Sequence, residues 1–158
     1  MSISMRGITA KALTAAAMAA VVVTGTAGSA SAAHAYAEKL VKGEYLGAGD
    51  YIERMTYSGD GYFRLIMQSD GNLVLYRVKY SNGDRKVCWA SNTQYIGGGN
   101  YVTYQQDGNF VMYPRWSNTA VWHSNTYGGG GSTVDINKFG VLYVGTTQIS
   151  SQAACTTF

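Results

Sequence analysis

The stretch MQSDGNLVLY, residues 67–76, returns 37 positions later as YQQDGNFVMY, residues 104–113. Both copies carry Gln, Asp, Asn, Val and Tyr at every second position, and hydrophobic residues alternate with them from Asn to Tyr. Alternation with a period of two is typical of a β-strand. Asp-Gly flanked by such alternation is a strong signal for a hairpin turn. The repeat therefore predicts two β-hairpins of the same design.

The length of the hairpin loop decides which side chains share a face. A two-residue loop would place Gln68 and Val74 on opposite faces. A three-residue loop, Asp70 to Asn72, pairs Gln68 with Val74 and puts Tyr76 on the same face. We expect the three-residue loop, with one of its residues in the left-handed region of backbone conformation.

Internal repetition extends beyond these two stretches. Trp89-Ala-Ser91-Asn-Thr93 matches Trp122-His-Ser124-Asn-Thr126, and a glycine run follows each segment. A weaker third unit covers residues 135–143, and an insertion near 77–87 lengthens the first unit. No stretch keeps an apolar period of 3.6 residues, so helices are not expected. The chain is predicted to be all-β, with three similar units.

The second face of each predicted hairpin is hydrophobic. A buried aliphatic side chain stabilises a fold by about 1.5–3 kcal/mol, and a register slip of one residue would expose it. The alternation should therefore fix the register, with one face in the core and the other forming a polar recess. The expected core positions are Phe63, Leu65, Met67, Leu73 and Leu75, then Val102, Tyr104, Phe110 and Met112, then Val134, Gly140 and Leu142.

The N-terminal residues have the features of a secretory signal peptide. Arg6 and Lys11 precede a short apolar run, residues 12–23, and Ala30-Ser31-Ala32 is a typical cleavage pattern. The apolar run is shorter than the roughly 20 residues of a membrane-spanning helix. We therefore expect a secreted, extracellular protein divided into a signal peptide (1–32), an N-terminal extension (33–43) and a single domain (44–158).

The charge excludes two classes of partner. The net charge of the whole chain is +3, and removal of Arg6 and Lys11 leaves 10 basic against 9 acidic residues, or +1. Such a chain has no strong field to attract nucleic acid or an anionic membrane. The basic residues of the insertion are interpreted as a solvated loop; they are Arg77, Lys79, Arg85 and Lys86. We expect no nucleic-acid partner and no insertion into a membrane.

The repeated side chains suit recognition of a polyol. A carboxylate accepts hydrogen bonds, whereas a carboxamide and a phenol both donate and accept them. An Asp and an Asn two residues apart suit a vicinal pair of sugar hydroxyls, and Val offers an apolar patch to the C–H face of a pyranose. Neither motif contains His or a nucleophile with its own base. Binding of a neutral sugar is therefore expected, rather than a reaction with it.

The pattern Q-x-D-x-N-x-V-x-Y resembles the motif of the bulb-type mannose-binding lectins. All five positions match in both copies, namely Gln68, Asp70, Asn72, Val74 and Tyr76, and Gln105, Asp107, Asn109, Val111 and Tyr113. The resemblance covers about residues 44–150 and implies a type II β-prism of three antiparallel sheets around a pseudo-threefold axis. It implies binding of α-mannose or mannose-containing glycans without a metal or other cofactor, in a secreted bacterial member of the family. In that pattern Asp and Asn hold the 2-hydroxyl, Gln the 3-hydroxyl and Tyr the 4-hydroxyl, while Val touches the ring carbons.

The third unit departs from the pattern. Asp135 aligns with Gln, Asn137 with Asp and Phe139 with Asn, so that only Val141 and Tyr143 match. Phe139 cannot hydrogen-bond a hydroxyl, and we expect a degenerate third site that is dead or altered. The resemblance also places tryptophans at the centre of the prism. Trp89 and Trp122 are thus expected in the core, with Ile149 in the place of a third.

Two cysteines, Cys88 and Cys155, predict one disulfide in a secreted chain. On the chain-entropy model the bridge would stabilise the fold by roughly 4 kcal/mol. An intermolecular bridge is the alternative. With His34 and His123 the cysteines match no zinc spacing, so no metal is expected. The resemblance further allows a homodimer through exchange of the C-terminal segment, residues 145–158.

Two other functional classes stay open at this point. A bacteriocin-like or other antimicrobial protein would use the same fold to target cell-surface sugars, and a growth-inhibition assay would separate it from a plain lectin. A glycosidase would need two carboxylates about 5–9.5 Å apart. Asp70 and Asp107 are expected on different sheets, so we predict that the chain is not an enzyme. If the motif served only to form a turn, the recurrence of Gln68 and Tyr76 as Gln105 and Tyr113 would have no explanation.

Overall fold

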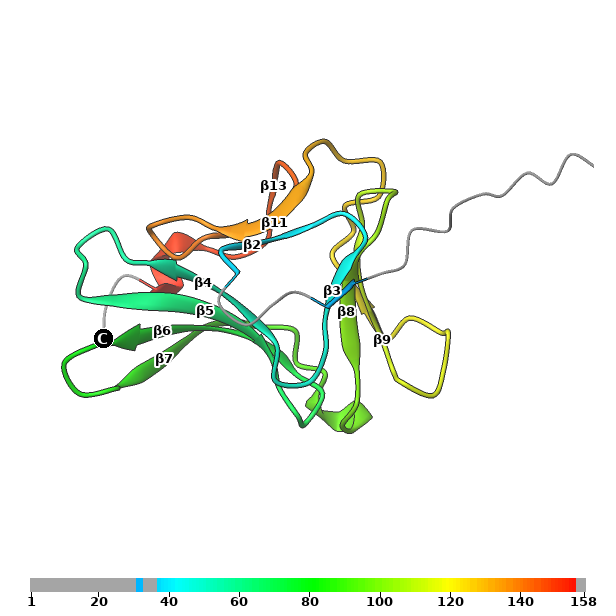
Figure 1. Ribbon diagram of the computed structural model, residues 1–158, viewed down its shortest axis with the longest axis horizontal. Coiled ribbons are helices and arrows are strands. Elements are labelled where there is room, and N and C mark those ends of the chain that lie inside the picture. Colours follow the sequence, from blue (N-terminus) through cyan, green and yellow to red (C-terminus); the bar gives the residue numbers. More distant parts are fainter. Residues whose placement is uncertain (1–30, 33–36, 156–158) are drawn as a thin grey trace, which may run out of the picture.

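The computed structural model describes residues 31–32 and 37–155. Three β-sheets form the sides of a triangular prism (Figure 1). The strand orders are β4–β5–β6–β7, β1–β3–β8–β9–β10 and β13–β12–β11–β2. Pairing within the sheets is antiparallel except between β1 and β3. This arrangement confirms the prediction of an all-β prism with three similar sheets.

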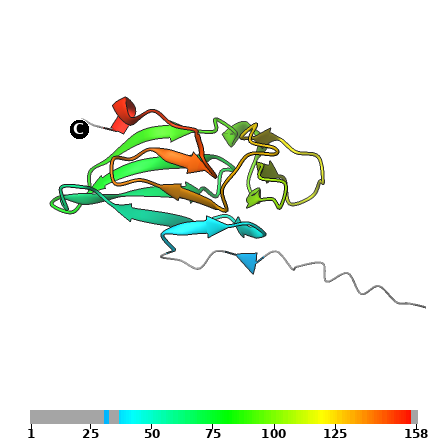
Figure 2. The same cartoon turned by 90° about the horizontal axis from the view of Figure 1, so that it is seen from above.

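The three sheets share one plan, but the first is built from consecutive strands whereas the other two include strands from much earlier in the chain. A hairpin supplies the two middle strands, an early segment supplies one outer strand, and the segment after the hairpin supplies the other. Figure 2 shows the early strands at one edge of the molecule and the C-terminal turn at the opposite edge. The bounds are β1 Ser31–Ala32, β2 Lys39–Val41, β3 Glu44–Leu46, β4 Tyr51–Met55, β5 Gly61–Met67, β6 Leu73–Lys79, β7 Arg85–Ala90, η1 Gln94–Ile96, β8 Tyr101–Tyr104, β9 Phe110–Tyr113, β10 Trp122–His123, β11 Thr133–Ile136, β12 Leu142–Val144, β13 Thr147–Gln148 and η2 Gln152–Cys155.

The expected start of the domain at residue 44 is too late. Strand β2, Lys39–Val41, pairs with β11 and closes the third sheet. Leu40 is fully buried in the common core. The N-terminal extension therefore contributes a strand to the fold. Of the expected signal peptide, residues 1–30 lie outside the described part of the chain, and residues 31–32 form β1 beside β3.

The predicted core positions fill the centre of the prism. All of the aliphatic and aromatic ones are buried, and they belong to one hydrophobic cluster. Trp89 and Trp122 pack against this cluster as expected, with their rings edge to face and 5.7 Å between centroids. Ile149 also packs there. However, the residue at the position of the third sheet equivalent to Trp89 is Thr147, which is exposed, so Ile149 packs against the core from a neighbouring position.

The hairpin loop has the expected length but begins one residue earlier. Met67 pairs with Leu73, and the Gln68 N–H donates to the Asn72 carbonyl at 2.8 Å. The loop is thus 69–71, and Gln68 opposes Asn72 instead of Val74. Because the partner changes by two residues, every side chain keeps its predicted face. Gly71 supplies the left-handed residue with φ of 95°, and a Cβ there would collide with the Gly97 carbonyl oxygen.

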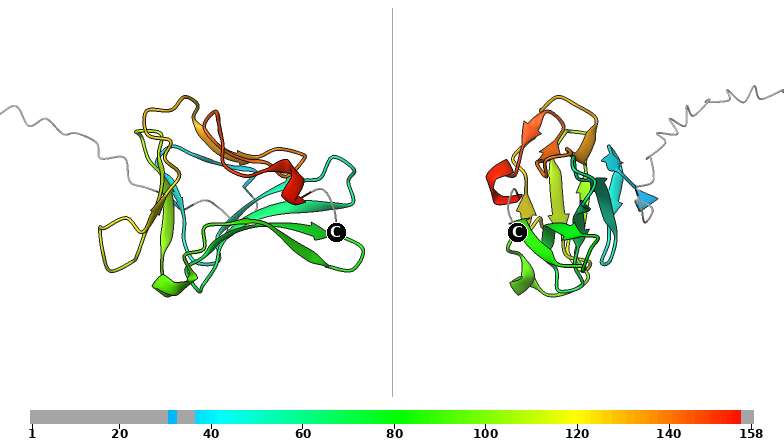
Figure 3. Two further views of the ribbon diagram at one scale, coloured as in Figure 1. Left: turned by 180° about the vertical axis from the view of Figure 1, so that it is seen from behind. Right: turned by 90° about the vertical axis from the view of Figure 1, so that its left-hand side faces the viewer.

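The C-terminal segment is fastened to the first sheet. Cys88 and Cys155 form a disulfide within the chain, which confirms the default prediction and shows the intermolecular alternative to be wrong. Figure 3 shows η2 beside the strands of this sheet. Arg77 donates to the Cys155 carbonyl at 3.3 Å and pairs with Asp60 at 2.9 Å. Hydrogen bonds from Ser58 and Thr56, with Arg77 nearby, lower the pKa of Asp60 to about 2.

Candidate functional site

The first motif gathers its polar side chains on the outer face of the β5–β6 hairpin. Gln68 Nε2 donates to the Tyr76 hydroxyl at 2.8 Å, which joins the two side chains on this face. The Asn72 N–H donates to Asp70 Oδ1 at 2.9 Å and fixes the carboxylate at the loop. Val74 is only 2% exposed and forms a small apolar floor instead of a broad patch. The predicted residues are thus brought together, and four of the five are accessible from solvent.

The second motif repeats this geometry on the β8–β9 hairpin. Gln105 Nε2 donates to the Tyr113 hydroxyl at 2.8 Å, and the Asn109 N–H donates to Asp107 Oδ1 at 2.9 Å. Val111 is 3% exposed. Two independent hairpins therefore hold the same set of side chains in the same mutual arrangement.

Each motif leaves hydrogen-bonding groups available to a ligand. In residues 37–155 no hydrogen bond occupies Asp70 Oδ2, Gln68 Oε1 or the Asn72 amide nitrogen. The Tyr76 hydroxyl accepts from Gln68 and keeps its own proton for donation. Acceptors and donors of this kind, held on one face of a hairpin, match a ligand that carries several hydroxyl groups.

The asparagine of each motif is held by the segment that follows the next strand, a support that is not evident from the sequence. Asn72 Oδ1 accepts from Ser91 Oγ at 3.0 Å and from the Thr93 N–H at 3.2 Å. Ser91 Oγ also accepts from the Leu73 N–H at 3.0 Å, and Thr93 Oγ1 donates to the Gly71 carbonyl at 2.7 Å. With Oδ1 occupied, the amide nitrogen of Asn72 must face the ligand side as a donor.

The same support exists in the second unit. Ser124 Oγ donates to Asn109 Oδ1 at 3.1 Å, and the Thr126 N–H donates to it at 3.2 Å. The repeated Trp-x-Ser-x-Thr segments were the signal for these residues. They were recognised as marks of repetition, but the sequence does not show which side chain across the sheet their hydroxyls contact.

The third hairpin is aligned two residues away from the predicted alignment. The Asn137 N–H donates to the Val141 carbonyl at 3.0 Å, as Gln68 does to Asn72 in the first unit. The Leu142 N–H donates to Ser150 Oγ at 2.8 Å, as Leu73 does to Ser91. Asn137 therefore occupies the place of Gln68 rather than that of Asp70.

The shifted alignment places different residues at the remaining positions. Phe139 stands at the place of Asp70, Val141 at that of Asn72 and Tyr143 at that of Val74. Gly140, with φ of 81°, corresponds to Gly71. Val141 and Tyr143, which matched the motif by spacing, do not occupy the motif's positions in the structure. Gly140 in the turn and the contact of Ser150 with Leu142 define this alignment, because their equivalents in the first unit are the turn residue Gly71 and the contact of Ser91 with Leu73.

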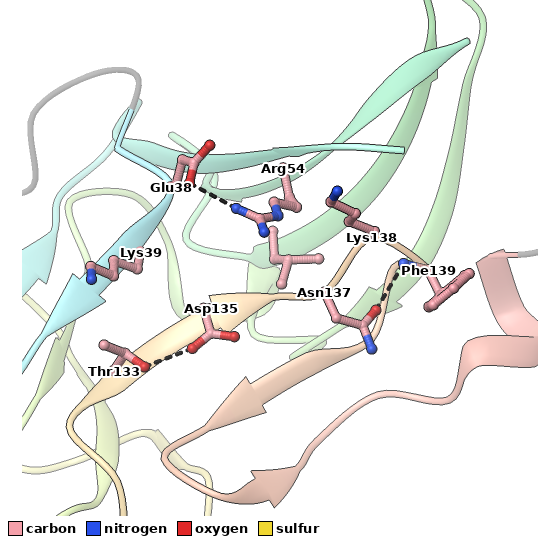
Figure 4. A pocket seen from close by; sticks show the side chains of 9 residues that line it. Glu38, Lys39, Arg54, Thr133, Asp135, Asn137, Lys138 and Phe139 are labelled. Atoms are coloured by element: carbon pink, nitrogen blue, oxygen red, sulfur yellow. Dashed lines mark hydrogen bonds and ion pairs between the residues drawn. The ribbon is translucent and has the colours of Figure 1, made fainter. Parts of the chain in front are cut away.

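Next to the third hairpin lies a hollow of about 560 Å³ (Figure 4). Asp135 accepts there from Thr133 at 2.6 Å, and Asn137 Oδ1 accepts from the Phe139 N–H at 2.9 Å. Arg54 is ion-paired with Glu38 at 2.7 Å. Val141 and Tyr143 do not line the hollow, so the four predicted residues of the third site are not gathered into one recess.

Other chemistries find little support in the structure. Asp70 and Asp107 lie on hairpins of different sheets, so they do not form a carboxylate pair. Within the described ranges, no three or more His, Cys, Asp or Glu side chains cluster as metal ligands do. His34, considered with the cysteines as a metal ligand, lies outside those ranges. Among the same residues, no helix has the length and hydrophobicity to cross a membrane.

Comparison with known proteins identifies several similar chains, although no protein-family model matches. A mannose-specific lectin of Dendrobium findlayanum is 40% identical over 74 residues, which are 47% of this chain and 37% of the relative. The chain thus spans less than two fifths of the length of that curated relative.

Solved structures match over a larger share. The mannose-specific agglutinin of snowdrop, Galanthus nivalis, in complex with methyl-α-D-mannoside is 32% identical, with a TM-score of 0.55 over 70% of this chain and 90% of that one. A monomeric monocot mannose-binding lectin from Gastrodia elata is 31% identical, with a TM-score of 0.53 over 72% and 94% of the two chains.

Proposed function

The chain belongs to the family of bulb-type mannose-specific lectins, and from this premise we propose that it binds α-mannose or mannose-containing glycans without catalysis. The two complete motifs, on the β5–β6 and β8–β9 hairpins, are the proposed sites. One observation carries the proposal: the same Gln–Tyr hydrogen bond, the same Asp-supported loop and the same Ser- and Thr-held Asn occur twice.

The geometry supports a sugar as the ligand. Asp70 offers a fixed charged acceptor, Asn72 a fixed donor, and the Gln68–Tyr76 pair an acceptor and a donor. A pyranose presents adjacent hydroxyls that both donate and accept, so it can satisfy all these groups at once. The relatives are named as lectins, in agreement with the prediction that the chain is not an enzyme.

Two equal sites on different sheets also favour binding of branched or clustered glycans. A single open site binds weakly, whereas two linked sites can raise avidity by about 10² to 10⁴. We therefore place the target on a multivalent surface. The signal-peptide features of residues 1–32 support secretion, which would expose the two sites to such surfaces.

One experiment tests binding and secretion together. The full chain, expressed in a host that exports proteins, is expected in the culture medium. Its mass should be that of a chain that begins near residue 33. The recovered protein should be retained on mannose resin in the presence of a metal chelator and be released by methyl α-mannoside. Methyl β-galactoside serves as the control sugar. Absence of retention would overturn the proposed function, and an uncleaved intracellular product would overturn secretion alone.

Replacement of Ser91, with replacement of Ser150 as its matched control, tests whether Ser91 positions Asn72. Each serine accepts a hydrogen bond from a backbone N–H in its own hairpin, but only Ser91 holds a motif side chain. Ser91→Ala and Ser150→Ala should both lower the free energy of unfolding, by about 1–3 kcal/mol, because each leaves a backbone donor without its partner.

Only Ser91→Ala should weaken mannose binding at the first site, by about fivefold, the equivalent of one hydrogen bond. Calorimetric titration with methyl α-mannoside in an Asp107→Ala background isolates that site. Equal affinities for the Ser91→Ala and Ser150→Ala proteins would show that the serine supports the hairpin and does not position Asn72.

A further inference from the structure

We propose that the first site prefers mannose glycans that carry a phosphate group, whereas the second site does not. This inference rests on the proposed mannose binding and names the substrate class of one of its two sites. It follows from a hollow beside the first motif that two arginines line, whereas the second motif has a tyrosine at the position of one of them.

The hollow continues directly from the first motif. It has a volume of about 290 Å³ and shares Gln68 and Tyr76 with the motif. Arg64 of β5 and Arg85 of β7 line it together with those two residues. A substituent on a sugar held by Gln68 and Tyr76, or on the next sugar of the same glycan, would enter this space.

Arg85 brings a positive charge to the motif. Its guanidinium lies over the Tyr76 ring, 5.8 Å from the centroid. Within residues 37–155 it forms no ion pair, and the adjacent Asp84 accepts instead from Asn82 at 2.6 Å. Arg85 is expected in a solvated loop; it lies instead at the start of β7, where its exposed side chain is placed beside the site by the antiparallel pairing of β6 with β7.

Arg64 is held in a fixed position next to Tyr76. It lies opposite Tyr76 across the β5–β6 pair and is ion-paired with Glu53. Its guanidinium also lies 4.1 Å from the ring centroid of Tyr51. Glu53 offsets the charge of Arg64, so the hollow keeps the net positive charge of Arg85. A guanidinium donates to two phosphate oxygens at once, which makes Arg85 suitable for a phosphate.

The second site differs at the corresponding positions. Tyr101 stands opposite Tyr113, where Arg64 stands opposite Tyr76 in the first unit. The rings of Tyr101 and Tyr113 stack, with centroids 5.8 Å apart. Arg115 lines another hollow, with Tyr45 and Tyr101, but no residue of the motif borders that hollow. The second motif thus has an aromatic neighbour where the first has a cationic one.

Single-site proteins separate the two sites. Asp107→Ala leaves the first site and Asp70→Ala leaves the second. The probes are a short mannose oligosaccharide with one phosphomonoester and the same oligosaccharide after phosphatase treatment. The Asp107→Ala protein should bind the phosphorylated form about tenfold more tightly in calorimetric titration at low salt, because the phosphate accepts charge-assisted hydrogen bonds in addition to those of the sugar. The Asp70→Ala protein should bind both forms within about twofold, since Tyr101 stands beside its Tyr113 where the first site has Arg64.

Arg85→Gln in the Asp107→Ala background tests the origin of the preference, and Arg115→Gln in the Asp70→Ala background is its control. The first change should reduce the tenfold preference to about twofold and leave binding of the dephosphorylated sugar unchanged. An equal preference at both sites, or a preference that survives Arg85→Gln, would overturn the inference. Failure of both single-site proteins to bind either sugar would instead overturn the proposed mannose binding.

Discussion

Replacing Asp70 and Asp107 together by alanine is expected to abolish retention on mannose resin while the protein stays folded. Each aspartate supplies the only carboxylate of its motif, and a hydrogen bond to a charged group contributes about 1.5–3 kcal/mol. Its loss lowers the affinity of each site by about 10- to 100-fold. The gain from simultaneous binding of two sites disappears as well. Column retention and titration with methyl α-mannoside measure the effect.

The fold should tolerate the double change. Asp70 accepts one loop hydrogen bond, from the Asn72 N–H, and its side chain is exposed. The backbone bonds of Gln68 with Asn72 and with Gly71 remain and hold the hairpin. Circular dichroism and the midpoint of urea unfolding should therefore change little. Asp70→Asn with Asp107→Asn keeps the loop acceptor and serves as a second variant if the alanine protein loses stability.

The third hairpin provides the negative control. Asp135→Ala removes a carboxylate from a unit that does not gather a motif, and we expect retention to stay unchanged. Changes at Asn137 and Phe139 should likewise leave the mannose affinity nearly unaltered. Full retention by the Asp70, Asp107 double variant would refute the assignment of both sites.

Removing the disulfide is expected to have the largest effect on stability. Cys88 and Cys155 are 67 positions apart, and a bridge that closes a loop of this length stabilises the native state by about 4 kcal/mol on the chain-entropy model. Both side chains are buried, so Cys88→Ala with Cys155→Ala avoids placing a polar group in the core. The free energy of unfolding from urea titration should fall by that amount.

A reducing agent gives the internal control for this change. It should lower the stability of the unaltered protein to the level of the double alanine variant and should leave the variant itself unaffected. At urea concentrations below the unfolding transition, mannose affinity should stay within about twofold, because both cysteines lie in the core cluster and the polar motif side chains lie on the outer face. A loss smaller than about 1 kcal/mol would mean that the bridge does not restrict the unfolded chain.

The sequence alone determined the features that follow from local periodicity. Alternation with a period of two assigned every motif side chain to the outer face and Leu65, Met67 and Leu75 to the core, and the structure confirms these faces. The recurrence of five polar and apolar positions in two copies indicates the two candidate sites without knowledge of any contact. The predicted loop position is wrong by one residue, which changes each pairing partner by two residues. Because side chains alternate between faces with a period of two, the predicted faces remain correct.

The tertiary structure decided everything that depends on pairing between distant segments. The strand at residues 39–41 pairs with the third sheet, and this pairing buries Leu40 in the common core. The turn glycine and the contact of Ser150 set the alignment of the third hairpin, against the spacing of Val141 and Tyr143. Pairing across the first sheet brings Ser91 to Asn72 and Arg85 to Tyr76. Spacing along the chain cannot reveal such neighbours, because hydrogen bonds and packing between strands far apart in sequence choose them.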